Sequence, residues 1–422
     1  MQTKKIVLPN GIRLLLVHKA DSLSVTTLVL VRAGLLYEDK RTNGISHFIE
    51  HMCFKGTKNW PKSIDLSREF ESMAANYNAF TGPEYTGYYA TVRPKHLKRS
   101  VTILADLYHN PLYDEGEMDR ERGVIKEEIK MYADQPGTHI QEIFDGMLYP
   151  NQPAGWNIGG TAESVDKLKV ADLIKYREKY YTGANTVIVI AGNFSAPQAK
   201  ELITKNFGHI RPGVVAKRAK PKYSQTKPEV IVESKKIDQV HFALGFRSFG
   251  SIHKDRATIG LLGKVLGGGM SSRLFQRIRV EMGAAYYIGA GQVARTDHGV
   301  FTIYGGVNAT QLNNVLSAVI DECHKLCDVG VGEKELQLAK DNVLGSLELG
   351  LETSNELASF VGYDELLEGK FYTVKQIEKE IEKVTVGDIK KLARKIMQNK
   401  SLNLAVLGPN LKKERFVRIL RV

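Results

Sequence analysis

Cysteine is scarce in this chain of 422 residues, which contains only three of them. Three cysteines cannot form a disulfide framework in so long a chain, so we expect a reducing, cytoplasmic location. Long apolar runs are missing as well, because no stretch approaches the roughly 18 residues that a membrane helix needs. The first residues lead into only a short apolar segment, which argues against a cleavable signal peptide. We therefore expect no membrane partner.

Acidic residues are outnumbered, since 47 Asp and Glu stand against 59 Lys and Arg and leave a net charge of +12. A positive balance can indicate nucleic-acid binding, or only good solubility. The densest basic cluster, Lys217 to Lys222, lacks the interleaved aromatic residues of RNA-binding surfaces. We therefore expect no nucleic acid as a partner. The hydrophobic fraction of 43% and the charged fraction of 25% are those of a folded chain and exclude extended disorder.

Short apolar runs bounded by turn residues predict a mixture of strands and helices. Asn10-Gly11 separates apolar runs at residues 6–8 and 12–17, which is a β-hairpin signal. Apolar residues recur at helical spacing within residues 45–52 and 97–108. Further strands are predicted at residues 25–31, 87–93 and 186–191. Because strands and helices do not strictly alternate, the fold class is α+β.

The second half of the chain repeats patterns of the first. A helix predicted around Asp172 leads to an apolar strand that ends in Gly192-Asn193, and a helix around Asp388 leads to one that ends in Gly408-Pro409-Asn410. The two aspartates are 216 residues apart, and the strand at 28–32 resembles residues 243–247 at about the same displacement. These matches predict an internal duplication.

We therefore predict two homologous domains, each a mainly antiparallel sheet packed with helices. The N-terminal domain would span residues 1–212 and the C-terminal domain residues 230–422. Residues 213–229 would link them, because this segment combines prolines and a basic cluster with no hydrophobic period.

The string His47-Phe48-Ile49-Glu50-His51 carries the clearest chemical signal. On a helix, residues four apart share a face, so His47 and His51 can reach one metal ion. Glu50 lies beside them without having to be a ligand, and the pattern is the inverse of the H-E-x-x-H zinc peptidase signature. The alternative is a pair of partly exposed histidines with a neighbouring salt bridge. A catalytic zinc would need a third protein ligand.

The acidic helix predicted at residues 117–132 is the best source of that ligand. A helical wheel places Glu121 and Glu128 on the apolar, inward face with Val124, whereas Glu127 falls on the side of the lysines. A carboxylate on a buried face needs compensation for its lost hydration, which a metal with its histidines would supply. A buried glutamate paired with arginine is the alternative.

The string from Gly44 to Thr57 resembles the pitrilysin/insulinase family of zinc peptidases. The length and the duplication are similar to the branch that contains mitochondrial processing peptidase and short bacterial zinc peptidases. The resemblance implies one zinc ion per chain, with His47, His51 and Glu128 as ligands. Glu128 lies 77 residues after His51. The resemblance also makes Glu50 catalytic and Glu121 the supporting glutamate.

The resemblance extends to substrate binding. Asn78-Ala79-Phe80-Thr81 resembles an edge strand that binds a peptide backbone by strand addition, with Asn78, Ala79 and Phe80 as the substrate-binding residues. The family usually has glycines just before it, where this chain has residues 74–77, Ala-Ala-Asn-Tyr. In the second half, Arg279 and Tyr286 resemble a catalytic pair that contacts the substrate near the scissile bond. Without the resemblance, a surface arginine and a core tyrosine would be the default interpretation.

The second half has no metal ligands at the positions equivalent to His47 and His51, which are Gly263 and Gly267. We therefore expect a zinc endopeptidase in which one half holds the metal and the other supplies substrate contacts. Glu50 would act as general base toward peptides or unfolded segments. The resemblance implies a chamber between the halves and a homodimer. The alternative is a non-catalytic scaffold, or the partner subunit of a peptidase heterodimer, similar to the core proteins of the respiratory bc1 complex.

Overall fold

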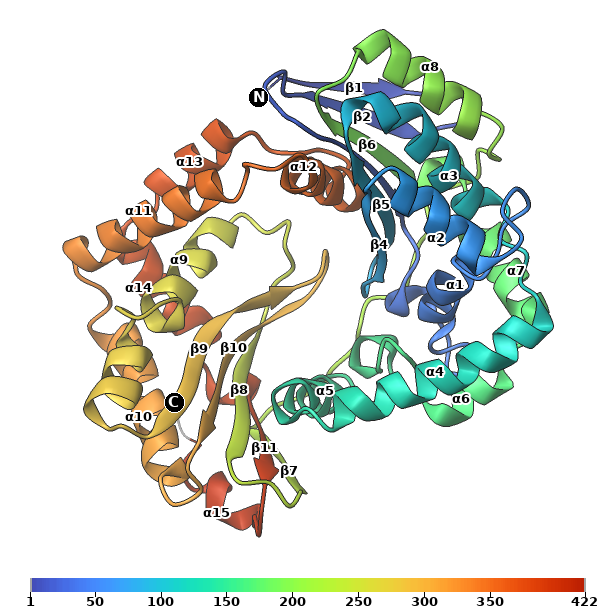
Figure 1. Cartoon of the computed structure of the whole chain (residues 1–422). Coiled ribbons are helices and arrows are strands. Elements are labelled where there is room, and N and C mark those ends of the chain that lie inside the picture. Colours follow the sequence, from blue (N-terminus) through green and yellow to red (C-terminus); the bar gives the residue numbers. More distant parts are fainter. Residues whose placement is uncertain (1, 421–422) are drawn as a thin grey trace. The chain divides into compact units, whose positions relative to one another are not determined.

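In the computed structural model, which describes residues 2–420, the chain forms two compact units (Figure 1). Unit 1 consists of Met1–Met131, Trp156–Ala219 and Glu348–Tyr372. Unit 2 consists of Tyr132–Gly155, Lys220–Leu347 and Thr373–Val422. Each unit contains one sheet packed with helices, so the α+β prediction is confirmed. No helix within the described residues is both long and apolar enough to cross a membrane.

The sheet of unit 1 has six strands in the order β1-β2-β6-β3-β5-β4. Neighbouring strands are antiparallel except β2 and β6. The central strands β3 and β6 are buried along their whole length, which explains their nearly unbroken apolar sequences. Among the described strands, β4 pairs with β5 alone and is therefore an edge strand. The strands are β1 (Gln2–Val7), β2 (Arg13–His18), β3 (Val25–Val31), β4 (Asn76–Thr81), β5 (Thr86–Val92) and β6 (Thr186–Gly192).

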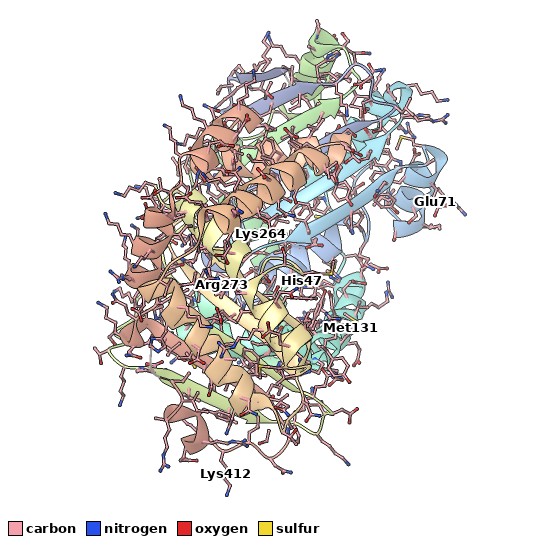
Figure 2. The ribbon with its side chains drawn as sticks, turned by 90° about the vertical axis from the view of Figure 1, so that its left-hand side faces the viewer. His47, Glu71, Met131, Lys264, Arg273 and Lys412 are labelled. Atoms are coloured by element: carbon pink, nitrogen blue, oxygen red, sulfur yellow. The ribbon has the colours of Figure 1, made fainter. Side chains whose placement is uncertain are left out.

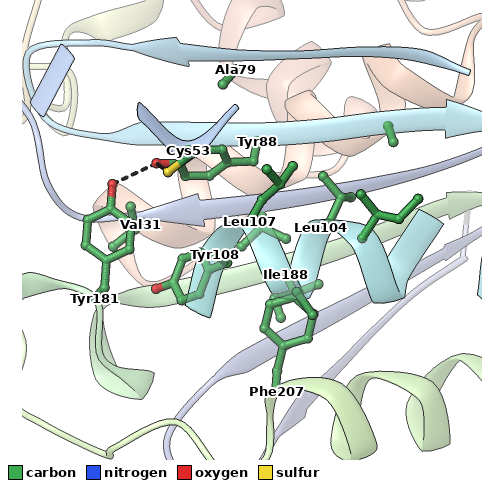
Figure 3. Packing of buried hydrophobic residues seen from close by; sticks show 14 of the residues in the cluster. Val31, Cys53, Ala79, Tyr88, Leu104, Leu107, Tyr108, Tyr181, Ile188 and Phe207 are labelled. Carbon is green, nitrogen blue, oxygen red and sulfur yellow. Dashed lines mark hydrogen bonds between the residues drawn. The ribbon is translucent and has the colours of Figure 1, made fainter. Parts of the chain in front are cut away.

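Helices cover both faces of this sheet. The larger core lies on one face, where Tyr88 of β5 packs with Leu104 of α3 and Phe207 of α8 (Figure 3). The opposite face is covered by α12, through a smaller core that includes Leu28 and Val189. The helices of unit 1 are α1 (Ile45–Cys53), α2 (Ser63–Ser72), α3 (Leu97–His109), most of α4 (Glu115–Ala133), α6 (Ala162–Lys167), α7 (Val170–Tyr180), α8 (Ala196–Phe207) and α12 (Ser354–Glu368).

The sheet of unit 2 has five strands in the order β7-β11-β8-β10-β9, with β7 and β11 parallel. These strands are β7 (Glu229–Ser234), β8 (Val240–Ser248), β9 (Ala285–Ala294), β10 (Gly299–Val307) and β11 (Leu402–Gly408). One face packs against α9, α10 and α14, and the other against α5. The helices are α5 (Pro136–Leu148), α9 (Arg256–Gly267), the π-helix η5 (Phe275–Glu281), α10 (Leu312–Asp328), most of α11 (Glu333–Leu349), α13 (Val374–Glu382), α14 (Val386–Ile396) and α15 (Glu414–Val417).

The strand orders show the duplication directly. The series β2-β6-β3-β5-β4 in unit 1 corresponds to β7-β11-β8-β10-β9 in unit 2, with the parallel pair at the same place. The helix–strand pair α7–β6 recurs as α14–β11 with every boundary displaced by 216 residues. The hairpin at Asn10-Gly11 is also confirmed, since β1 and β2 pair antiparallel.

Helices α5 and α12 each pack in the unit that is not expected from their position in the sequence. Leu357 and Val361 of α12 pack on β3 and β6 of unit 1, although α12 follows most of unit 2 in sequence. Phe144 of α5 packs on the sheet of unit 2, although α5 directly follows α4. Domains at residues 1–212 and 230–422 therefore do not describe the units. Each exchanged helix buries its apolar face on a sheet built from distant residues, and sequence order carries no trace of that.

The predicted linker is a segment without regular structure. Residues 211–226 contain no helix, strand or turn, and the division between the units falls inside the segment, after Ala219. Arg218 nevertheless forms a buried ion pair with Glu84 in unit 1, at 2.6 Å. The first part of the segment is therefore held by unit 1.

Candidate metal centre

Helix α1 presents both histidines of the motif on one face. Phe48, Ile49 and Met52 face the core and are buried, which turns His47 and His51 the other way. Their ring centroids lie 4.6 Å apart. The helical spacing therefore produces the predicted pair of imidazoles, and it does so because the apolar residues of α1 fix its rotation. Figure 2 labels His47 on this helix and Met131 near the end of α4.

The third member of the cluster is Glu128 of α4. Its Oε2 lies 3.6 Å from Nε2 of His47 and 3.4 Å from Nε2 of His51. Two ligand atoms bound ~2.1 Å from a tetrahedral zinc ion stand ~3.4 Å apart, so one ion can bind all three atoms. Within the part of the chain that the structure describes, this is the one group of three or more such residues with metal-ligand spacing.

The two adjacent glutamates of α4 point in different directions. The side chain of Glu127 is 73% exposed and pairs with Lys130 at 2.7 Å, whereas Glu128 turns toward the histidines. Glu121 lies on the same side as Glu128 and is buried. The wheel also places Val124 on the inward face, but this residue is 51% exposed. The helical wheel gives the direction of a side chain, but burial also requires that a neighbouring element covers it. The predicted burial of Val124 is therefore wrong.

Glu121 lies behind His51 and fixes its ring. Its Oε2 accepts a hydrogen bond from Nδ1 of His51 at 2.9 Å, which leaves Nε2 free for a metal. Its other oxygen pairs with Lys55. Burial raises the pKa of Glu121, but the bonds from His51 and Lys55 outweigh burial and hold that pKa below its ordinary value. Lys55 was not predicted, although it stands one helical turn after His51 in the same motif.

The pKa values of the histidines move in opposite directions. Burial, with a smaller effect of His51, lowers the pKa of His47 to about 4, so its ring is neutral at pH 7 and can bind a metal. Burial also lowers the pKa of His51, but Glu121, Glu128 and Glu50 together raise it above its ordinary value. The surplus of carboxylates around His51 therefore favours a cation at this place.

Glu50 stands beside the cluster without belonging to it. Its Oε2 accepts a hydrogen bond from the hydroxyl of Thr81, on the edge strand β4. Burial raises its pKa, and the Thr81 hydrogen bond only partly reverses this. A carboxylate with a raised pKa next to a metal position can take up and release a proton. Thr81 belongs to the predicted edge-strand motif, but its hydrogen bond to Glu50 was not predicted.

The predicted substrate strand is an edge strand, as expected. Ala79 is buried and faces the core, whereas Asn78 is exposed and its Oδ1 accepts a hydrogen bond from the N–H of Ala79 at 2.9 Å. Phe80 lies on the face covered by α12, where its ring is 6.1 Å from that of Tyr363. Ala74 has a φ of 49°. This residue therefore adopts the left-handed conformation for which glycine is preferred, in the segment where the family usually has glycine.

Arg279 and Tyr286 both belong to unit 2, and the metal cluster belongs to unit 1. Arg279 lies on η5 with its guanidinium 5.1 Å from the ring centre of Phe275. Tyr286 is at the start of β9 and is 67% exposed, so it is not a core tyrosine. η5 ends at Glu281 and Gly283 has a φ of 59°, so no continuous helix joins the two residues. Their common role stays a prediction.

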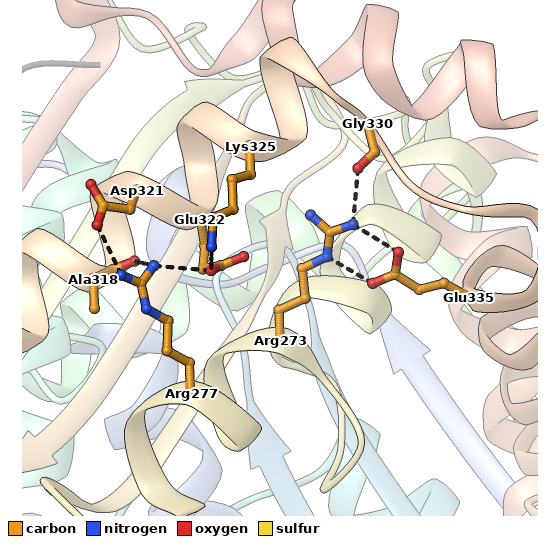
Figure 4. A network of polar contacts seen from close by, with 8 residues as sticks. All are labelled: Arg273, Arg277, Ala318, Asp321, Glu322, Lys325, Gly330 and Glu335. Atoms are coloured by element: carbon orange, nitrogen blue, oxygen red, sulfur yellow. Dashed lines mark hydrogen bonds and ion pairs between the residues drawn. The ribbon is translucent and has the colours of Figure 1, made fainter. Parts of the chain in front are cut away.

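Ion pairs hold the segment that carries Arg279. Arg277 binds Asp321 at 2.9 Å and Glu322 at 3.0 Å on α10 (Figure 4). Arg273 binds Glu335 of α11 at 2.7 Å. A π-helix often marks a functional position, and these contacts give η5 a fixed place within unit 2.

The duplicated positions of the histidines are glycines for a packing reason. A Cβ on Gly267 would lie 2.3 Å from the backbone N of Ala290, and one on Gly263 would lie 3.0 Å from Cα of Gly291. Helix α9 therefore packs closely on β9 through Gly263 and Gly267. The equivalent positions of α1 in unit 1 are His47 and His51, which belong to the candidate metal cluster. An imidazole at Gly267 would overlap the backbone of β9, and one at Gly263 would be tightly crowded by it.

The chain is similar in sequence to known peptidase families and zinc proteases. Residues 13–162 match the family model of insulinase, peptidase family M16, and residues 167–343 match the model described as the peptidase M16 inactive domain. The chain is 35% identical to the uncharacterized zinc protease YmxG of Bacillus subtilis, over 96% of this chain and 98% of that protein. It is 30% identical to the uncharacterized zinc protease SCO5738 of Streptomyces coelicolor, over 96% and 89%.

Solved structures share the fold at lower identity. A protease from Helicobacter pylori has a TM-score of 0.89 and 23% identity over 97% of this chain and 99% of its own. A chain of Complex III2 from Candida albicans has a TM-score of 0.85 and 15% identity over the whole of both chains. Two family models and relatives of 30% identity or more cover most of the sequence, and the chain therefore belongs to the insulinase family of peptidases, M16.

Proposed function

We propose that this protein is a zinc-dependent endopeptidase that hydrolyses peptides or unfolded segments. The observation that carries the proposal is the cluster of His47, His51 and Glu128 with Glu50 beside it. The relatives named zinc proteases support a peptidase role and the choice of zinc. One zinc ion per chain fits the donor set, because two imidazoles and one carboxylate leave a tetrahedral position open for water.

A zinc ion bound there would polarise the scissile carbonyl and lower the pKa of water. The protein's own residues perform the remaining steps. Glu121 holds the tautomer of His51 that leaves Nε2 available. Glu50 accepts a proton from the attacking water and passes it to the leaving amine, and its raised pKa suits both transfers. Thr81 holds the carboxylate of Glu50 in place.

Strand addition on β4 supports an extended substrate. The main chain at Asn78, Ala79 and Phe80 has an unpaired side, because β4 has a neighbour only in β5. A peptide that pairs there binds through its backbone, with little regard to sequence. Arg279 would hydrogen-bond a substrate carbonyl and Tyr286 would stabilise the developing oxyanion. Both assignments, the chamber between the halves, the homodimer and the cytoplasmic location belong to the proposal.

A non-catalytic subunit is the second candidate, and two comparisons favour it. The Complex III2 chain shares the fold, and the second half matches a model described as inactive. Against it, this chain retains the cluster of His47, His51 and Glu128, with Glu50 beside it. A subunit without catalytic activity would not require a general base beside a complete set of metal ligands.

Incubation of the full chain with a mixed peptide library separates the two candidates. Cleavage that is lost with a chelator, restored by zinc and absent from Glu50→Gln supports the peptidase. A wild-type protein that binds zinc but cleaves nothing, even at high enzyme concentration, would contradict it and favour the subunit role.

A further inference from the structure

Besides Glu121, a further buried carboxylate, that of Glu38, lies at the N-terminal end of helix α1. It is only 6% exposed, and within the described part of the chain no lysine, arginine or histidine forms an ion pair with it. Its Oε2 accepts hydrogen bonds from the N–H of Gly44 at 2.8 Å and the amide of Asn43 at 3.1 Å. Its Oε1 accepts one from the N–H of Ser46 at 3.0 Å. Glu38 therefore caps the helix of the metal centre.

Burying this carboxylate is unfavourable in itself. Burial raises the pKa of Glu38 to about 7, although the hydrogen bonds from Ser46, Gly44 and Asn43 lower it. The helix N-terminus, with its free N–H groups and partial positive charge, and the side-chain amide of Asn43 compensate the lost hydration. A group that is unfavourable to bury and holds the start of the helix that carries two candidate metal ligands is itself a candidate for a functional role.

The cap fixes the first turn of α1 from several sides. Gly44 has a φ of 93°, and a Cβ there would lie 2.7 Å from the carbonyl oxygen of Gly159. The amide of Asn43 also donates to the carbonyl of Asn157 at 3.0 Å. The hydroxyls of Ser46 and Tyr176 are 2.9 Å apart. The backbone is therefore fixed in the residues that directly precede the first metal ligand.

The two histidine ligands differ in how their rings are held. His51 donates from Nδ1 to Glu121, whereas Nδ1 of His47 is buried and has no hydrogen-bond partner within the described residues. The ring of His47 is thus positioned by packing and by its own backbone, and that backbone directly follows Ser46. The cap at Glu38 reaches His47 through the helix backbone, whereas Glu121 reaches His51 through a side chain.

We propose that Glu38 is a positioning residue, which fixes the first turn of α1 and thereby places His47 for metal binding. This rests on the proposed zinc peptidase function. It adds a requirement outside the H-x-x-E-H motif, nine residues before its first histidine. Residues that orient metal ligands typically change metal affinity by about 10–100-fold when they are replaced.

The test compares Glu38→Gln with Glu84→Gln. The substitution at Glu38 keeps the size of the side chain but turns one NH₂ group toward N–H donors, so at least one cap bond is lost. Glu84 is a buried glutamate of the same unit, and its carboxylate pairs with Arg218. Its replacement disturbs a buried ion pair while the three donors of the cap keep their acceptor. Zinc affinity is measured on the full chain by competition with a chromogenic chelator, and the melting temperature is measured without metal.

We expect Glu38→Gln to bind zinc about 10–100-fold more weakly, while Glu84→Gln keeps the wild-type affinity whatever its melting temperature. In peptide cleavage, kcat of Glu38→Gln at low zinc should fall, be recovered by excess zinc, and leave KM unchanged, because β4 is untouched. If Glu38→Gln does not fold, Glu38→Asp takes its place in the test. This variant keeps the charge but withdraws it by one methylene, so it should bind zinc more weakly than wild type, while Glu84→Gln should not.

Equal zinc affinities of wild type and the Glu38 variant that folds would overturn the inference. Equal losses in the Glu38 and Glu84 variants would overturn it as well, because general destabilisation would then explain both. A wild-type chain that binds no zinc refutes the proposed function instead. The two failures are thus distinguishable from the same titrations.

Discussion

The hydroxyl of Thr81 donates a hydrogen bond to the carboxylate of Glu50, and this bond joins the edge strand β4 to the helix that carries the metal ligands. In the proposed function, a peptide added to β4 would lie next to Thr81, which orients the proposed general base. In the proposed function, strand β4 would therefore both bind the substrate and, through Thr81, hold the general base on helix α1.

Replacing Thr81 by Val should lower kcat and leave KM and zinc content unchanged. The variant keeps the shape of the side chain but removes the donor, and a hydrogen bond to a charged group contributes about 1.5–3 kcal/mol. That corresponds to a loss of roughly 10–100-fold in kcat. Thr81→Ser keeps the hydroxyl and should retain most of the activity. Equal rates for the Val and Ser variants would contradict a role for the hydroxyl.

Glu50→Gln should retain zinc and lose hydrolysis. A neutral amide cannot accept a proton from water, whereas the three ligand atoms of His47, His51 and Glu128 are unchanged. Zinc content by mass spectrometry of the native protein and cleavage of a quenched fluorescent peptide check both parts. Loss of zinc from this variant would make Glu50 a ligand.

The adjacent glutamates of α4 give a matched pair of variants. Glu128→Gln should lose most of its zinc, because one of three protein ligands is removed. Glu127→Gln should be nearly silent, because its carboxylate is exposed and pairs with Lys130 at the surface. Equal zinc contents in the two variants would contradict the assignment of Glu128.

Tyr286→Phe tests whether unit 2 takes part in the reaction. We expect full zinc content and an unchanged melting temperature, because Tyr286 is largely exposed. If its hydroxyl stabilises the oxyanion, peptide cleavage should slow by ~10²–10³. An unchanged kcat and kcat/KM would show that this hydroxyl does not reach the reacting carbonyl.

The pH dependence of stability should depend on Glu38. Burial raises its folded-state pKa from 4.5 to about 7, so the ionised carboxylate opposes folding above pH 7 and the penalty disappears as the pH falls toward 4.5. The full effect is about 3 kcal/mol. The free energy of unfolding of the metal-free wild type, measured in urea relative to Glu38→Gln, should therefore rise between pH 8 and pH 5.

Asp145 in unit 2 serves as the comparison for this measurement. Burial raises its pKa to about 6, so it contributes a change of the same sign that Glu38→Gln leaves in place. A wild-type minus variant difference that is constant from pH 8 to pH 5 would show that Glu38 does not titrate in this range.

The local features of the fold could be predicted from the sequence. The hairpin at Asn10-Gly11, the strand at Val25–Val31 and the helix that carries His47 and His51 agree with the structure. Each depends on turn residues or on side-chain periodicity within a few positions. The periodicity of one helix likewise predicted that Glu128 points toward the histidines and that Glu127 points outward.

The contacts between residues that are distant in the sequence were decided by the tertiary structure alone. The exchange of α5 and α12 depends on which sheet offers an apolar face, and the contacts of Lys55 with Glu121 and of Thr81 with Glu50 depend on elements that meet only after packing. A single sequence specifies which residues can bind a metal, because the spacing on a helix is a local property. It points to Glu121 as the supporting carboxylate, but it does not specify the contacts of Thr81 or Lys55, because those distances are fixed only when helices and sheets close around a shared core.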